Sequence, residues 1–337
     1  MRRLGAALSA LALVAGLPAA ADIGADPLAW LQRAAASARQ QTYSGTVVHM
    51  QGDRTSTSRI THVVVAGIEH ERIESLDGPR REVVREGEKM QCFFPDAKTV
   101  RIDRRVTARF FPSLVAGPVE AIAESYDLAL GGIERVLGQD CQWIHLDPKD
   151  RLRYAQRLCA ELGTGLLLRA KTLGGRQNER VLEQYTFTDL RVGREVSRRD
   201  VKSPFVALSR SWRRDEQPAP EPKAGETGWA VASLPAGFRL VGEMQRTLPN
   251  RPQPVTQLVL SDGLATMSVF VEPLAGTPQA AQAADPSRRG TGEAVNQDGA
   301  LSVYVRPVGE HLVTVLGEVP PAAAQQVGRS VGRPAAR

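Results

Sequence analysis

The stretch "DGPRREVVREGEKMQCFFP", residues 77–95, places charged side chains beside apolar ones with a period of two. Such alternation predicts two short β-strands, and Glu86-Gly87 predicts the tight turn that joins them. Successive side chains of a strand point to opposite faces of a sheet. We therefore expect an antiparallel hairpin with one face in a core and its charged face in water.

The same pattern continues on both sides of this hairpin. Asp26-Pro27 predicts the start of a helix that runs to about Gln40, because Asp caps a helix and Pro suits its first position. A second helical pattern covers 114–130, interrupted by Gly117-Pro118. Between and after the helices, period-two segments predict strands at 43–50, 56–67, 68–78, 98–105, 141–146, 152–162, 165–173 and 181–190.

The chain of 337 residues is long enough for two domains. Residues 1–21 are typical of a secretory signal peptide, with Arg2 and Arg3, an apolar run and small residues before the cleavage site. The remainder divides into a first domain at 22–210, a polar, proline-containing linker at 211–228 and a second domain at 229–332. In the second domain we expect a hairpin across Asp262-Gly263, a loop at 274–293 and a final helix from Ala322 to about Val331.

Net charge gives little support for a nucleic-acid partner. Removing Arg2 and Arg3 from 43 basic residues leaves 41 against 37 acidic ones, a formal charge of +4. The basic residues form no cluster interleaved with aromatic residues, which excludes the usual nucleic-acid surface. The mild charge is compatible with an anionic lipid or an acidic peptide.

Three cysteines, Cys92, Cys141 and Cys159, follow the signal peptide. Export predicts an oxidising compartment. Cys141 and Cys159 lie on two predicted strands joined at "DPKD", residues 147–150, so they could face each other within one register step. We predict a disulfide between them, the alternative being two buried thiols. Cys92 is left as a small core residue.

The sequence carries no motif for catalysis, a cofactor or a metal. It lacks a G-x-S-x-G elbow, a phosphate loop and a zinc spacing. His49, His62 and His70 fall on neighbouring predicted strands, where solvated histidines are more common than a metal site. A binding protein without enzymatic activity fits best, and an unrecognised hydrolase is the weakest option.

Several segments, in order along the chain, resemble the RseB/MucB family of periplasmic sigma-E regulators. The quoted stretch 77–95 is one of them. The others are "FPSLVAGP" (111–118), "YDLALGG" (126–132), "LPAGFRLV" (234–241), "LVLSDGLATMSVFVE" (258–272) and "VLGEVPPAAAQQVGRSV" (315–331). The resemblance covers both expected domains.

The resemblance implies an α+β fold, with a large N-terminal curved antiparallel sheet or half-barrel and helices (LolA-like), followed by a smaller C-terminal α+β domain. It implies a periplasmic protein that binds the periplasmic domain of a membrane anti-sigma factor of the RseA/MucA type and shields it from the site-1 protease. Lipopolysaccharide or a related lipid would release it. No cofactor is implied. The oligomeric state stays open, a homodimer included.

Residue roles do not transfer from the family by sequence alone. The charges in 77–95 fit cross-strand ion pairs on a wet face, or an edge that docks a partner. Arg80, Arg81 and Glu82 are our candidates for such an edge, although we expect the partner mainly on the second domain and linker. The alternative function is a periplasmic lipid or lipoprotein carrier, a role for which the second domain is not needed.

Overall fold

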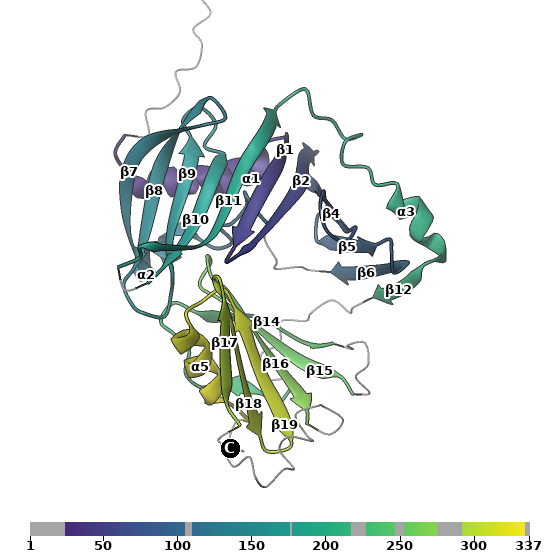
Figure 1. Ribbon diagram of the computed structural model, residues 1–337, viewed down its shortest axis with the longest axis vertical. Coiled ribbons are helices and arrows are strands. Elements are labelled where there is room, and N and C mark those ends of the chain that lie inside the picture. The colour runs from purple at the N-terminus through teal and green to yellow at the C-terminus, as the bar shows by residue number, and fades with distance from the viewer. Residues whose placement is uncertain are drawn as a thin grey trace, which may run out of the picture.

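The computed structural model describes residues 24–104, 110–175, 177–216, 227–246, 253–274 and 292–333. The predicted signal peptide, and nearly all of the loop expected at 274–293, lie outside these ranges. The described chain forms a large sheet and a separate smaller sheet, each packed against helices or a helix, which confirms the predicted α+β class (Figure 1). None of the helices in these ranges is both long and apolar enough to span a bilayer.

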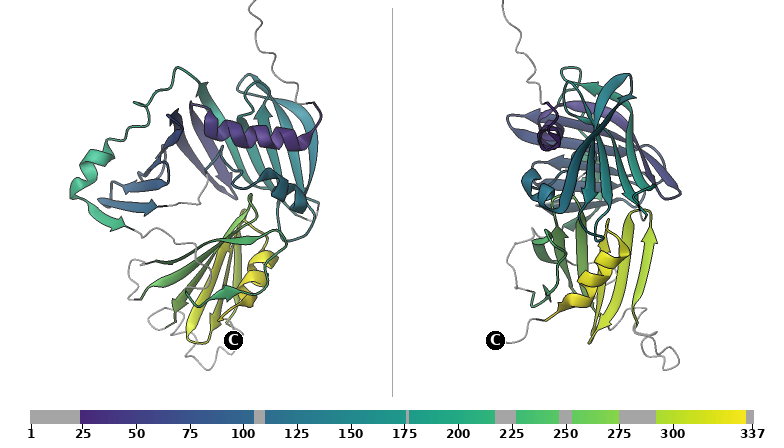
Figure 2. Two further views of the ribbon diagram at one scale, coloured as in Figure 1. Left: turned by 180° about the vertical axis from the view of Figure 1, so that it is seen from behind. Right: turned by 90° about the vertical axis from the view of Figure 1, so that its left-hand side faces the viewer.

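The large sheet has twelve strands, and it curves so that its two end strands remain apart (Figures 1 and 2). Neighbouring strands are antiparallel except for the last pair, β6 and β12. In spatial order the strands are β7 (Tyr126–Val136), β8 (Gln139–Pro148), β9 (Ala155–Glu161), β10 (Leu167–Gly174), β11 (Arg180–Val192), β1 (Tyr43–Gln51), β2 (Arg54–Val65), β3 (Ile68–Ser75), β4 (Glu82–Glu86), β5 (Lys89–Phe94), β6 (Thr99–Arg104) and β12 (Arg213–Glu216).

The quoted stretch forms β4 and β5, with the predicted turn between them. Glu86 pairs with Lys89, and Gly87 adopts a positive φ of 56°, which a glycine accommodates without strain. The expectation of one wet, charged face was wrong, however. Val83 packs with Met90 and Cys92 on one face, while Val84 and Phe93 pack with Phe205 and Trp212 on the other. Both faces are covered here because α3 (Phe205–Leu208) and the turn η1 (Ser209–Ser211) cross the outer side.

Helix α1 (Pro27–Gln40) begins and ends where the sequence predicted. Asp26 caps it by accepting a hydrogen bond from the Leu28 amide at 2.9 Å. Its apolar side packs into the cluster that covers the concave face of the large sheet, and it lies across several strands in Figure 2. The buried apolar residues of the helix are Trp30, Leu31, Ala34, Ala35 and Ala38.

Two boundaries differ from the sequence prediction. The helix expected over 114–130 is limited to α2 (Val119–Ser125), because Tyr126 already pairs with Pro148 in the sheet. Strand pairing there overrides a helical spacing of apolar residues. The segment expected as a linker, 211–228, also includes part of the large sheet, since Arg213–Glu216 form β12, where Asp215 accepts a hydrogen bond from Arg101 at 3.1 Å.

The small sheet carries the second core. Its strands in spatial order are β14 (Arg239–Arg246), β15 (Val255–Ser261), β16 (Thr266–Pro273), β19 (His311–Gly317), β18 (Leu301–Val308) and β17 (Ala294–Asp298). The predicted hairpin is β15–β16, and helix α5 (Pro321–Ser330) covers one face with Ala323, Ala324 and Val327. A short pair, β13 (Ala230–Val231) with β20 (Val331–Gly332), joins the two ends of this unit.

A buried ion pair joins the two sheets. Arg153, in the loop between β8 and β9, donates to the Asp262 carboxylate at 2.7 Å, and both side chains are 1% exposed. The same guanidinium also pairs with Asp150, donates to the Ala236 carbonyl and lies 5.0 Å from the centre of the Phe238 ring. We call this group the clasp, because it ties the β15–β16 hairpin to the large sheet.

We expect Arg153→Met to destabilise the protein by about 3 kcal/mol, because it leaves the Asp262 carboxylate buried without its partner. Thermal or urea unfolding measures the loss. The neighbouring Arg151 is exposed, so Arg151→Met is the matched control and should change little. Equal stability of the two variants would contradict the clasp.

The structure joins Cys141 to Cys159, the pair that the sequence suggested, with 5.3 Å between their Cα atoms. The two are not directly opposite: Cys159 pairs with Trp143, and Cys141 pairs with Glu161. The bridge is therefore diagonal, two residues out of register. It lies on the face of the sheet opposite to Ile144 and buries Leu168 beneath it. Cys92 is a buried free thiol.

We expect an alkylating reagent to modify one cysteine of the unfolded protein when the disulfide is intact. After reduction it should modify all three, and mass spectrometry measures the number. Replacing both Cys141 and Cys159 by Ser should lower the free energy of unfolding by about 3 kcal/mol, because the bridge closes a loop of 18 residues in the unfolded chain. Alkylation of three cysteines without reduction would rule the bridge out.

Candidate functional site

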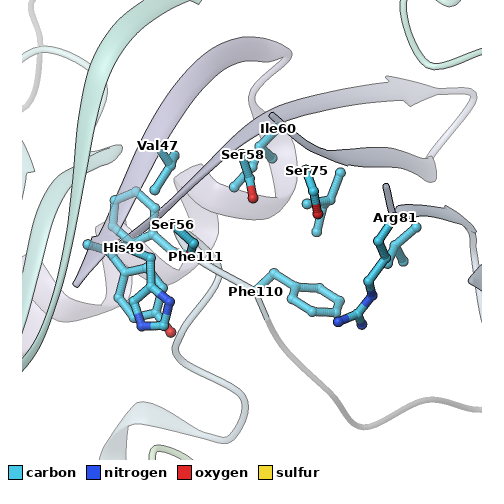
Figure 3. Close-up of a pocket in the computed structure, with 12 residues that line it drawn as sticks. Val47, His49, Ser56, Ser58, Ile60, Ser75, Arg81, Phe110 and Phe111 are labelled. Carbon is cyan, nitrogen blue, oxygen red and sulfur yellow. The ribbon is translucent and has the colours of Figure 1, made fainter. Parts of the chain in front are cut away.

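A hollow of about 230 Å³ opens on the concave face of the large sheet. Nine of its lining residues come from strands, while Arg81 directly precedes β4 and Phe110 and Phe111 come from outside the sheet. The strand residues are Val47 and His49 of β1, Ser56, Ser58 and Ile60 of β2, Ile73 and Ser75 of β3, Val83 of β4 and Tyr185 of β11 (Figure 3).

The hollow has an apolar wall and a polar wall. Register places Ile60 beside Ile73, and Ile73 beside Val83, in one apolar row across three strands. Ser58 and Ser75 form the next pair on the same face. The polar row ends at Arg81, because the Ser75 amide donates to the Arg81 carbonyl at 2.9 Å. Figure 3 shows Arg81 at one end of the hollow, His49 and Phe111 at the other, and Phe110 between them.

Stacked rings and a buried carboxylate close the His49 end. The Phe111 ring stacks on Tyr185 at 5.5 Å, and Tyr185 stacks on His49 at 4.1 Å. Glu183, 3% exposed on its side chain, accepts from the Tyr185 hydroxyl at 2.9 Å and contacts His49 at 2.7 Å. Burial, followed by the Glu183 charge, raises the pKa of Tyr185 well above its usual value, so the hydroxyl stays protonated as a donor.

The segment 110–118, which we call the strap, runs from the hollow to the small sheet. Phe111 at its start is 2% exposed and packs on Tyr185 and Phe187. Further along, the Ala116 amide donates to the Gly263 carbonyl of the β15–β16 hairpin at 2.8 Å. The strap therefore contacts both the hollow and the small sheet.

The three predicted edge residues do not form one surface. Arg81 faces the hollow, and its guanidinium lies 5.9 Å from the centre of the Phe94 ring. Arg80 lies over Phe205 of α3 at 5.7 Å. Glu82 is 1% exposed and accepts from Arg72 at 2.8 Å, so its carboxylate is not accessible to a partner in this conformation.

The sequence analysis did not identify the serines and phenylalanines that line the hollow. Ser56 and Ser58 alternate along β2, and Ser75 follows the same face of β3. This alternation of serines on a strand was the available signal for a polar wall. The aromatic pair Phe110-Phe111 carried no periodic signal, because it lies outside any helix or strand.

Among the described residues, no group of three or more His, Cys, Asp or Glu side chains is placed to hold a metal ion. The three histidines considered from the sequence have separate partners. His49 contacts Glu183, His62 contacts the Gln41 carbonyl at 2.8 Å, and His70 lies 3.8 Å from Glu86. Each therefore belongs to a local polar contact.

Glu318, between β19 and α5, brings a further carboxylate toward Glu183. Partial desolvation of its carboxyl group, followed by the Glu183 charge, raises the pKa of Glu318 from 4.5 to about 7, while His49 acts in the opposite direction. The residue as a whole is exposed. The Glu183 charge in the large sheet thus influences an acidic group of the small-sheet domain.

We expect the stability of the wild-type protein to fall relative to that of Glu318→Gln as pH rises. Desolvation and the Glu183 charge disfavour the Glu318 carboxylate in the folded state, so the two proteins should be similarly stable below about pH 4.5, and the wild type should lose stability as pH rises from there through about 7. Thermal unfolding midpoints at a series of pH values measure the difference. Glu310→Gln, at an exposed turn, is the control, and an identical pH slope in both variants would contradict the assignment.

Two separate family models match the domain of the large sheet and the domain of the small sheet. The family model described as the MucB/RseB N-terminal domain matches residues 26–205, and the MucB/RseB C-terminal domain matches residues 223–332. The sigma factor AlgU regulatory protein MucB of Pseudomonas aeruginosa is 33% identical over 314 residues, 91% of either chain. The sigma-E factor regulatory protein RseB of Escherichia coli K12 is 24% identical over 326 residues, 96% of either chain.

Solved structures agree with these matches. The Pseudomonas aeruginosa MucA/MucB complex has a chain that superimposes with a TM-score of 0.70 at 31% identity, covering 93% of this chain and all of that one. A crystal structure of MucB alone gives a TM-score of 0.61 at 28% identity, covering 90% of this chain and 96% of that one. The relatives are named as regulators of sigma factors rather than as enzymes. The chain belongs to the MucB/RseB family.

Proposed function

We propose that this chain is a regulator without catalytic activity that binds the periplasmic domain of a membrane anti-sigma factor. The observation that carries the proposal is the ordered match of both domains to MucB, which has been solved in complex with MucA. While bound, the chain shields the anti-sigma factor from the site-1 protease. The sigma factor then stays sequestered until the chain is released.

A lipid, of the lipopolysaccharide kind or related to it, supplies the release signal in this proposal. The hollow supports it, because an apolar row beside serines and Arg81 suits an acyl chain with a polar or anionic head. At about 230 Å³ the hollow is smaller than the roughly 300–1,000 Å³ of most ligand sites. It accommodates part of one acyl chain as it stands, and a complete lipid requires it to widen.

The periplasm is the proposed location. The signal-peptide pattern of residues 1–21 and the Cys141–Cys159 bridge support it, since such bridges persist in oxidising compartments. We propose a mature chain that starts at residue 22. Its first domain extends from residue 22 to the end of β12, because β12 pairs with β6 of the large sheet, and its second domain covers 229–332.

A lipid or lipoprotein carrier is the second candidate, and the hollow is the observation that favours it. The clasp favours the regulator instead. Arg153 and Asp262 hold the small sheet against the large one, and a domain that only delivered lipid would gain nothing from that attachment. The two candidates differ in whether lipid leaves the chain for an acceptor or changes what else the chain binds.

Pull-down and protease protection test the proposal. The mature chain should retain the periplasmic segment of the anti-sigma factor from the same genome and slow its cleavage by the site-1 protease at least tenfold. An unrelated exported protein of similar charge serves as the control. Absence of both binding and protection would end the proposal.

The lipid part has its own readout in the same assay. Purified lipopolysaccharide should restore cleavage in the presence of the chain and leave the protease rate unchanged in its absence. Transfer of bound lipid to acceptor vesicles, with protection unaffected, would favour the carrier instead.

A further inference from the structure

We infer that the strap, residues 110–118, couples the hollow to the domain contact, so that an acyl chain entering the hollow loosens the small sheet from the large one. The inference deepens the lipid part of the proposed function and rests on it. It assigns the coupling to one segment of the chain and to two contacts, Phe111 in the hollow and Ala116 at the hairpin.

The hollow has one wall that can move at low cost. The strand residues that line it are held by the hydrogen bonds of the sheet, and Arg81 is held by the Ser75 amide. Phe110 and Phe111 lie outside helices and strands, and the contacts of Phe111 are with the rings of Tyr185 and Phe187. Ring packing gives way to an apolar ligand more readily than a hydrogen-bonded ladder, because the ligand replaces the apolar contact it displaces.

Enlargement of the hollow therefore moves the start of the strap. The two backbone hydrogen bonds at its start, Ser113 to Phe110 at 2.7 Å and Leu114 to Pro112 at 3.0 Å, close turns within the strap itself. These turns make 110–114 a compact unit that shifts as a whole. Ala116 follows two residues later, so a shift of this unit reaches the domain contact.

The contact between the strap and the small domain is closely packed. A Cβ atom built on Gly117 would lie 3.0 Å from the Gly263 Cα, and Gly263 itself has a φ of +97°, which other residues rarely adopt. The two backbones are thus in direct contact, next to the hydrogen bond from Ala116 to Gly263. A small displacement of the strap must either break this contact or push the hairpin away.

Gly263 adjoins Asp262, the carboxylate of the clasp. Movement of the hairpin at Gly263 is therefore transmitted to the ion pair with Arg153. Buried, close-packed contacts of this kind switch between discrete arrangements rather than deform gradually. Lipid in the hollow thus favours one position of the strap, and docking of the small domain favours the other. Lipid binding must therefore weaken domain docking by the same free energy by which domain docking weakens lipid binding.

Gly117→Val tests this coupling from the domain side. The added side chain forces the strap off Gly263 and should raise the affinity for myristoyl lysophosphatidate, a probe with one acyl chain and one phosphate, by about fivefold or more. Isothermal titration of the mature chain measures it. Gly132→Val is the matched control, because nothing lies within 4 Å of a Cβ at Gly132. Equal affinities in the two variants would overturn the inference.

Phe111→Ala tests the coupling from the hollow side, since it creates room without moving the strap. Spin labels on cysteines at Arg135 and Glu310, exposed on the two domains, report the distance between them. Lysophosphatidate should lengthen or broaden this distance in the wild-type background, and should bind the Phe111→Ala background with the distance unchanged. The same shift in both backgrounds would overturn the inference.

The failure of the lipid proposal gives a different result. If the wild-type chain binds no lysophosphatidate and no lipopolysaccharide, the lipid part of the proposed function falls and the coupling falls with it. Binding of lipid by wild-type protein with no change in distance removes the coupling alone. Retention of the anti-sigma factor segment is measured separately and is untouched by either result.

Discussion

The buried ion pair between Arg153 and Asp262 is the constraint on which the rest of this structure depends. It fixes the β15–β16 hairpin against the large sheet with almost no exposure of either side chain. The neighbouring Gly263 then meets the strap at backbone distance, and the strap begins in the hollow. The tip of this hairpin thus carries one contact between the domains together with the contact to the non-sheet wall of the candidate ligand site. Further contacts between the domains join Arg246 to Asp103 at 2.9 Å and Gln297 to Tyr154 at 2.9 Å.

The proposed coupling would let one binding protein respond to two ligands without catalysing a reaction. In this proposal, a partner that needs both domains is favoured while the clasp and the strap contact are intact, and an acyl chain is favoured when the hollow is wider than about 230 Å³. Each ligand would then weaken the binding of the other by the same free energy. The polar row of Ser58, Ser75 and Arg81 adds a preference for a charged or hydroxylated head.

The sequence predicted the features that depend on interactions between adjacent residues. Asp26-Pro27 located the start of α1, and Asp262-Gly263 located the hairpin, because caps and turns depend on a few adjacent residues. Prediction from the sequence failed where a residue's structure or burial depends on a segment far away in the chain. Tyr126 joins the sheet because β8 lies beside it, and Glu82 is buried because α3, more than a hundred residues later, covers the outer face. The curved sheet was expected from the family resemblance, but the lining of the hollow by Phe110 and Phe111 depends on where the strap lies in space.

Hydrogen exchange at the Ala116 amide, followed by NMR or mass spectrometry, tests the central claim most directly. This amide donates to Gly263 across the two domains, so its exchange rate reports the contact itself. Saturating lysophosphatidate should speed its exchange while the amides of β2 and β3, in the body of the large sheet, stay as slow as before. An Ala116 amide that remains equally protected with lipid bound would contradict the account.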